Sequence, residues 1–162
     1  MSRTLLVTFA VGLVVVAIAV VGAVYVARGG HVELPGKILK VRTAPLDEQS
    51  SAAVIDFRVT NPADHPFQVR SVTVVLEDRA GVQTEGATAS EIDAQRLLAG
   101  VPLLGDKYNQ SLMVRERVPP HTTLDRMTAA RFEVPDSKLQ ARKRFLVRIE
   151  EWDGIVQEMS EK

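Results

Sequence analysis

The stretch from Ala53 to Asp78 (AVIDFRVTNPADHPFQVRSVTVVLED) constrains the fold most, because it predicts two β-strands separated by a proline-rich turn. In its first half Ile55, Phe57 and Val59 alternate with polar residues, which is typical of a strand with one buried and one solvated face. Pro62 ends this strand, because proline donates no backbone hydrogen bond. Two strands alone cannot bury an apolar face, so the rest of the chain must supply more.

The second strand changes phase along its length. Phe67 and Val69 stand at odd-numbered positions, whereas the later apolar residues Val72, Val74 and Leu76 stand at even-numbered ones. In a regular strand these two sets would point to opposite faces. A β-bulge between Val69 and Val72 would keep both halves facing one core. We therefore expect a bulge at this point.

The segment from Leu5 to Val26 (LLVTFAVGLVVVAIAVVGAVYV) carries no charge. As a helix it would be about 33 Å long, close to the roughly 30 Å hydrocarbon thickness of a bilayer. We expect one N-terminal transmembrane helix, a signal anchor. The expected organisation is a short tail (1–4), the helix (5–27), a linker (28–36) and a folded domain (37–159).

A cleaved signal peptide is the alternative for this segment. Small residues at 21–23 could form a cleavage site, but the apolar run exceeds the roughly 7–15 residues of such peptides. Positive charges after the helix, from Arg28 to Arg42, favour a cytoplasmic domain. Long domains often translocate regardless of flanking charge, however, and a short tail before the helix is usual for signal anchors. We expect a single-pass protein of the cell membrane with its domain on the extracytoplasmic (periplasmic) side.

The segment from Ser90 to Gly100 interrupts the β pattern and predicts a short helix. Ser90 is a favourable N-cap, and the first turn is acidic. Ile92 and either Leu97 or Leu98 are expected to face the core. We expect this helix to cover an end or edge of a sheet.

The remaining segments predict further strands, with a helical turn after Pro135 and a hairpin at Asp153 and Gly154. The expected strands outside the central stretch are 37–41, 111–118, 124–134, 144–150 and a last one from Ile155. Glu85 and Gly86 are expected to form a turn. About seven short strands with one or two short helices predict an all-β fold, an antiparallel immunoglobulin-like β-sandwich.

The central stretch also carries a recognisable pattern: a strand ending in Asn61 and Pro62, a short polar gap, then Pro66 and Phe67 before a valine-rich strand. It resembles the β-sandwich late embryogenesis abundant (LEA type 2) proteins, which carry the water stress and hypersensitive response (WHy) domain. The resemblance covers about 25 residues. It implies a seven-stranded sandwich with a small helix, pairing of the two central strands within one sheet, and a non-enzymatic, stress-related role.

Composition and motifs offer little support for catalysis. Cysteine is absent, which excludes disulfides, thiolate metal sites and a cysteine nucleophile. His31, His65 and His121 fall in linker or turn segments without metal-ligand spacing. No nucleophile or phosphate-binding motif occurs, and a net charge of zero does not favour nucleic acid. We expect no enzyme activity, no cofactor and no metal.

Three residues are candidates for partner contacts. Tyr108 and Asn109 lie in a predicted loop that begins with Leu103. Trp152 is expected to pack on the core, with partial exposure as a contact residue as the alternative. The main hypothesis is a membrane-anchored binding or protective domain whose partner is an envelope protein, a polymer or a lipid. A docking subunit of a membrane complex is the alternative.

Overall fold

The computed structural model describes residues 12–14, 16–21 and 34–161. The chain divides into two compact units, Met1–His31 and Val32–Lys162. In the first unit residues 12–14 and 16–21 are helical. No helix within the described ranges is long and apolar enough to cross a membrane. Most of the predicted span, Leu5 to Val26, lies outside these ranges, so it stays a prediction.

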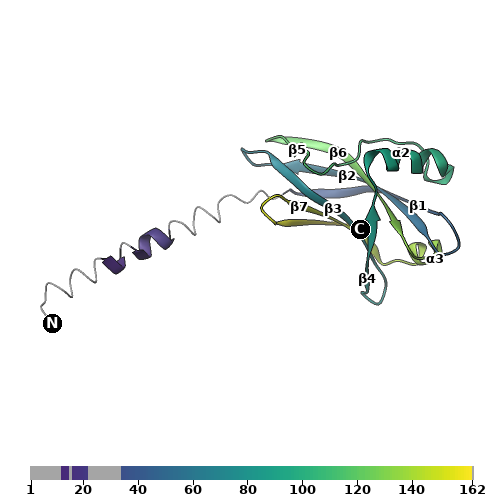
Figure 1. Ribbon diagram of the computed structural model, residues 1–162, viewed down its shortest axis with the longest axis horizontal. Helices are drawn as coiled ribbons and strands as arrows, with labels where there is room; N and C mark the ends of the chain where they lie inside the picture. Colours follow the sequence, from purple (N-terminus) through teal and green to yellow (C-terminus); the bar gives the residue numbers. More distant parts are fainter. Residues whose placement is uncertain (1–11, 15, 22–33, 162) are drawn as a thin grey trace, which may run out of the picture. The chain divides into compact units, whose positions relative to one another are not determined.

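The described part of the second unit contains eight β-strands in one curled antiparallel sheet (Figure 1). The strands are β1 (Gly36–Pro45), β2 (Ser51–Asn61), β3 (Phe67–Glu77), β4 (Gln83–Thr88), β5 (Arg117–Val118), β6 (Thr122–Phe132), β7 (Arg144–Glu151) and β8 (Val156–Ser160). Their order is β1-β2-β6-β4-β3-β7-β8, and β5 pairs with β3. The helices are α2 (Glu91–Gly100), the 3-10 turn η1 (Pro102–Leu104) and α3 (Asp136–Gln140).

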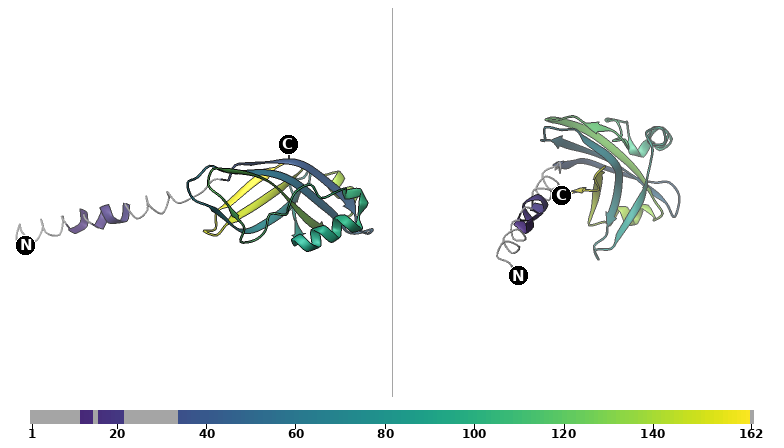
Figure 2. Two further views of the ribbon diagram at one scale, coloured as in Figure 1. Left: turned by 90° about the horizontal axis from the view of Figure 1, so that it is seen from above. Right: turned by 60° about the vertical axis from the view of Figure 1, so that its left-hand side comes forward.

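The sheet folds over into two layers at β4. The first part of β4 pairs with β3, where Gly86 lies opposite Val74, and its last residues Ala87 and Thr88 pair with β6. One layer is therefore β1-β2-β6 and the other is β3-β7-β8, and two views show them facing each other (Figure 2). The predicted antiparallel β-sandwich is confirmed at this level.

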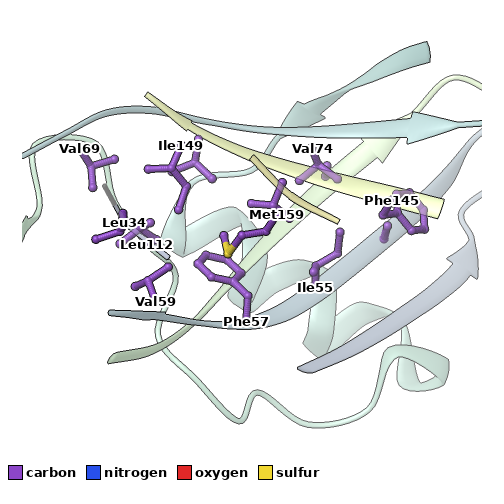
Figure 3. Packing of buried hydrophobic residues seen from close by; sticks show 14 of the residues in the cluster. Leu34, Ile55, Phe57, Val59, Val69, Val74, Leu112, Phe145, Ile149 and Met159 are labelled. Carbon is purple, nitrogen blue, oxygen red and sulfur yellow. The ribbon is translucent and has the colours of Figure 1, made fainter. Parts of the chain in front are cut away.

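The main core fills the space between the layers. Ile55, Phe57 and Val59 of β2 point into it, as predicted, opposite Val74 of β3 and Phe145 of β7 (Figure 3). The other fully buried large side chains of this cluster are Leu34, Phe67, Phe132, Leu139 and Ile149. These inward faces supply the burial that stabilises both layers.

A second, smaller core lies on the outer face of β1-β2-β6 beneath α2. Alanines of the strands, such as Ala44 and Ala52, leave room for the helix, which buries Ala94 and Leu98 against them. Ser90 caps α2 as predicted, accepting a hydrogen bond from the Asp93 backbone N–H. The expected position at a sheet end or edge is wrong, because α2 covers a face. The described Ile92 side chain is 60% exposed, so its predicted inward orientation is wrong too.

The central strands do not pair with each other, contrary to what the family resemblance implies. β2 pairs with β1 and β6, whereas β3 pairs with β4, β5 and β7. The turn at residues 62–66 therefore connects the two layers. The first half of β2 is also buried on both faces, because α2 and η1 cover its outer side.

The predicted bulge in β3 is confirmed. The pairing of β3 with β7 shifts between Val69 and Ser71. This shift lets Val69 and Val72 both enter the core, although they differ in parity.

Two predictions of strand position are wrong. The expected strand at 111–118 is reduced to β5, because the chain turns at Arg115, whose φ is 68°. The expected turn at Glu85 and Gly86 is instead the middle of β4. Gly86 reflects close packing and not a turn, since a Cβ there would lie 2.6 Å from Cζ of Phe132.

Replacing Gly86 with alanine should destabilise the domain by about 1–3 kcal/mol, the usual cost of overpacking a filled core. The Phe132 ring cannot move away easily, because it is buried and packs 5.7 Å from the Phe145 ring. Gly100→Ala is the matched control, since a Cβ there meets nothing within 4 Å. Denaturant unfolding of both variants measures the difference. Equal stability of the two variants would contradict the close packing of Gly86 against the Phe132 ring.

Glu77 gives the domain a defined response to acid. A hydrogen bond from Lys143, followed in size of effect by one from Arg144, holds the pKa of the Glu77 carboxyl below its usual value of 4.5. A lowered folded-state pKa stabilises the fold above the unfolded pKa, and this contribution is lost as pH falls through the folded value. Glu77→Gln should therefore lower the melting temperature at pH 7, and the deficit should shrink below about pH 4.5. A deficit that stays constant as the pH falls would refute this role. Glu48→Gln is the control for the removal of an exposed carboxylate.

Candidate functional site

A buried ion pair lies beneath the loop that follows α2. Arg42 projects from β1 and Asp56 from the neighbouring β2, and Arg42 Nη2 lies 2.7 Å from Asp56 Oδ2. Their side chains are only 8% and 4% exposed. Two opposite charges on adjacent strands thus satisfy each other in the second core, where either one alone would be costly.

The pair fixes the loop of residues 101–110, called here the contact loop. Arg42 Nη1 donates to the carbonyl oxygens of Leu104 (2.6 Å) and Asp106 (2.7 Å). Asn109 Nδ2 donates to Asp56 Oδ1 at 2.8 Å. Both Asp56 oxygens are therefore bonded within the fold, one to Arg42 of β1 and the other to Asn109 of the contact loop.

Glu91, in the first turn of α2, holds the end of the contact loop. Its Oε1 pairs with Lys107, and its Oε2 accepts the Ser111 N–H at 3.0 Å. The backbone of Gln110 in turn accepts a hydrogen bond from Met127 of β6. The loop is thus tied to α2, β1, β2 and β6 along its whole length.

This clamped loop presents two large side chains to solvent. Leu103 is 76% exposed and Tyr108 is 61% exposed. Lys40 Nζ lies 5.0 Å from the Tyr108 ring centroid, and the Arg42 guanidinium lies 5.1 Å from it. These cation–π contacts restrict the ring, so a partner would meet an ordered surface of low conformational entropy.

The motif residues of the resemblance have a local structural explanation. Asn61 is fully buried and donates through Nδ2 to the carbonyls of His65 and Val118, while its Oδ1 accepts the Ala63 N–H. Phe67 is buried in the main core. The two flanking prolines, Pro62 and Pro66, are exposed.

The structure does not bring Trp152 together with the contact loop. Its backbone N–H donates to the Gln68 carbonyl at the start of β3. The side chain is 59% exposed, so the expected packing on the core is wrong and the alternative of exposure holds. The Asp153 and Gly154 turn beside it takes a positive φ of 91° at the glycine, which leaves Trp152 at the tip of the predicted hairpin.

The described histidines lie in turns, as predicted, and His31 lies outside the described ranges. His121 Nε2 is 2.9 Å from Asp64 Oδ1, and both side chains are largely exposed. Across residues 12–14, 16–21 and 34–161, no group of three or more histidine, cysteine or acidic side chains could hold a metal ion.

The sequence predicted Tyr108 and Asn109 as contact residues, but it did not point to Arg42 and Asp56, which the structure places against them. Asp56 was assigned to the solvated face of its strand, and Arg42 was placed just after the predicted strand 37–41. A signal was available: on the same face of β2, Asp56 follows the apolar Val54, which is typical of burial. An acidic residue in such a position needs a basic partner on a neighbouring strand.

Asp56→Asn should destabilise the domain by about 3–5 kcal/mol, because Arg42 would remain buried without its counter-charge. The control is Asp125→Asn on β6, which breaks the half-exposed pair with Arg58 and should cost much less. Denaturant unfolding compares the two. The double variant Arg42→Met and Asp56→Leu should recover most of the stability but leave the contact loop sensitive to protease. Similar losses for Asp56→Asn and Asp125→Asn would contradict this account.

Comparison with known proteins yields structural similarity only. No protein-family model matches the chain, and no curated protein matches it. A β-sandwich protein from Clostridium difficile 630 is 12% identical with a TM-score of 0.43, over 82% of this chain and 91% of that one. The putative ApaA protein from Bordetella pertussis is 18% identical with a TM-score of 0.33, over 81% of this chain and 89% of that one.

Proposed function

We propose that this protein is a non-catalytic binding domain, anchored in the cell membrane by its N-terminal segment and carried on the extracytoplasmic side. The observation that carries the proposal is the contact loop. Leu103 and Tyr108 are exposed on a loop held by buried hydrogen bonds and an ion pair. Surface loops otherwise expose such residues at a cost, and aromatic side chains on a rigid support are common anchors of binding surfaces.

The anchor rests on the apolar N-terminal segment. The run from Leu5 to Val26 contains no charge, and its described portions, residues 12–14 and 16–21, are helical. The large apolar side chains described in this segment are exposed, namely Leu13, Val14, Val16, Ile18, Val20 and Val21. An uncharged helix with apolar residues on every side is suited to lipid.

The partner class follows from the surface chemistry. An exposed leucine and tyrosine beside Lys40 suit an apolar surface with acidic or polar edges, as an envelope protein or polymer can offer. The resemblance of residues 53–78 to LEA and WHy proteins suggests protection of other envelope components under stress. Docking within a membrane complex is the second candidate, because the same loop would serve as its contact surface.

The anchor and the loop can be tested together in full-length protein. We expect the protein to resist carbonate extraction of membranes, and we expect protease to digest the domain in intact spheroplasts. A photo-reactive residue at position 103 should form discrete adducts that disappear with Tyr108→Ser, while the same label at the exposed Val82 should form none. Protection of the domain until lysis would refute the extracytoplasmic location. Identical adducts at both positions would refute the contact loop as the binding surface.

The two candidate roles differ in one further measurement. A protectant should reduce the aggregation of an unrelated enzyme during drying, and Leu103→Ser with Tyr108→Ser should weaken this effect. A docking subunit should show no such effect and should lose its complex when residues 5–27 are exchanged for another membrane helix.

A further inference from the structure

A second set of exposed apolar residues lies at the end of the sandwich where the chain enters the domain. Leu34 is buried there beside Val59, Val69 and Leu112 (Figure 3). The Pro35 carbonyl accepts a hydrogen bond from Thr60 N–H, which fixes the start of β1 at the same end. We call this the tether end of the domain.

Two turns flank the start of β3 at the tether end. On one side Arg115 N–H donates to the Val69 carbonyl at 2.7 Å. On the other side Trp152 N–H donates to the Gln68 carbonyl at 3.1 Å. The two turns therefore lie on either side of one strand, although they are far apart in sequence.

These turns expose a mixture of apolar and basic groups, called here the tether rim: Met113, Val114, Arg115, Arg117 and Trp152. The three apolar members are 40%, 56% and 59% exposed, in the order Met113, Val114, Trp152.

The tether rim exposes two guanidinium groups. Neither rim guanidinium, Arg115 or Arg117, has a hydrogen bond or ion pair within the described part of the chain. Two of the nearby acids are paired, Glu116 with Arg126 and Glu150 with Arg70. Two more carboxylates flank Trp152 in the sequence: Glu151 is buried, and Asp153 accepts a hydrogen bond from the Ile155 N–H.

The length of the tether places this rim near the bilayer if the segment 5–27 spans it. Seven steps along the chain lead from position 27 to Leu34, and a fully extended chain of that length reaches about 25 Å. The tether end cannot lie farther than this from the end of the helix. Tryptophan together with arginine is the combination that membrane interfaces favour.

We propose that the tether rim rests on the headgroup layer of an anionic bilayer, with Trp152 and Val114 at the level of the acyl boundary and Arg115 and Arg117 facing lipid phosphates. This inference rests on the proposed anchor. It adds a second membrane contact, which would fix the orientation of the domain on the bilayer.

Trp152 is the only tryptophan in the chain, so its fluorescence reports on this contact directly. Full-length protein would be reconstituted into phosphatidylcholine–phosphatidylglycerol vesicles with or without brominated acyl chains. We expect brominated lipid to quench the emission, and we expect the vesicles to protect it from aqueous acrylamide. Quenching should be weaker in pure phosphatidylcholine.

The control is Trp152→Phe with Val82→Trp, which moves the reporter to the exposed turn between β3 and β4, away from the tether end. Its emission should be unaffected by brominated lipid. Carbonate resistance of the reconstituted protein reports on the anchor separately. If the protein resists carbonate extraction but its emission is not quenched, the proposed membrane contact of the tether rim is overturned and the proposed anchor is kept. If carbonate extracts the protein, both proposals are overturned. Equal quenching in both vesicle types would overturn the preference of the tether rim for anionic lipid. Protection from acrylamide without quenching by brominated lipid would overturn the lipid contact and indicate a protein partner.

Discussion

The fold depends on one close contact, that of the Gly86 backbone with the Phe132 ring. β4 must leave the β3 layer and join β6 within six residues, and it can do so only where two layers come together. The Phe132 ring occupies the space that a side chain at position 86 would fill. Because that ring also contacts Phe145 of the opposite layer, the crossing and the main core are parts of one packed arrangement. Loss of this fit would affect both layers at once.

The buried ion pair has a different role from the apolar core. Arg42 Nε is buried without a hydrogen-bond partner among the described residues, so the desolvation of the guanidinium is not fully offset. Apolar residues of similar volume could give comparable stability. What they could not provide is two donors aimed at the carbonyls of Leu104 and Asp106. The pair therefore specifies the conformation of the contact loop more than it raises the stability of the domain.

Much of the architecture could be predicted from the sequence because local patterns determine it. The alternation at Ile55, Phe57 and Val59 identified an inward face, and the parity change after Val69 identified a bulge. Ser90 marked the start of α2. The partners of the strands could not be predicted in this way. Nothing local distinguishes a turn that joins paired strands from one that crosses between layers, so the placement of β2 and β3 in different layers required the full set of strand contacts. The site was only half predictable for the same reason, since Arg42 and Asp56 acquire their roles when α2 and η1 cover them.

The free edges of the curled sheet, β1 and β8, have a consequence for crowding. Gly36 of β1 lies so close to Met159 of β8 that a Cβ would fall 2.2 Å from its sulfur, and β1 carries a bulge between Ile38 and Lys40. The two edge strands thus pack against each other, and the bulge interrupts the regular hydrogen-bonding row that another strand would need on β1. Molecules confined to a surface meet one another far more often than molecules in free solution do. A domain held at a membrane as proposed would be protected by this geometry from joining its neighbours edge to edge, even at high surface density.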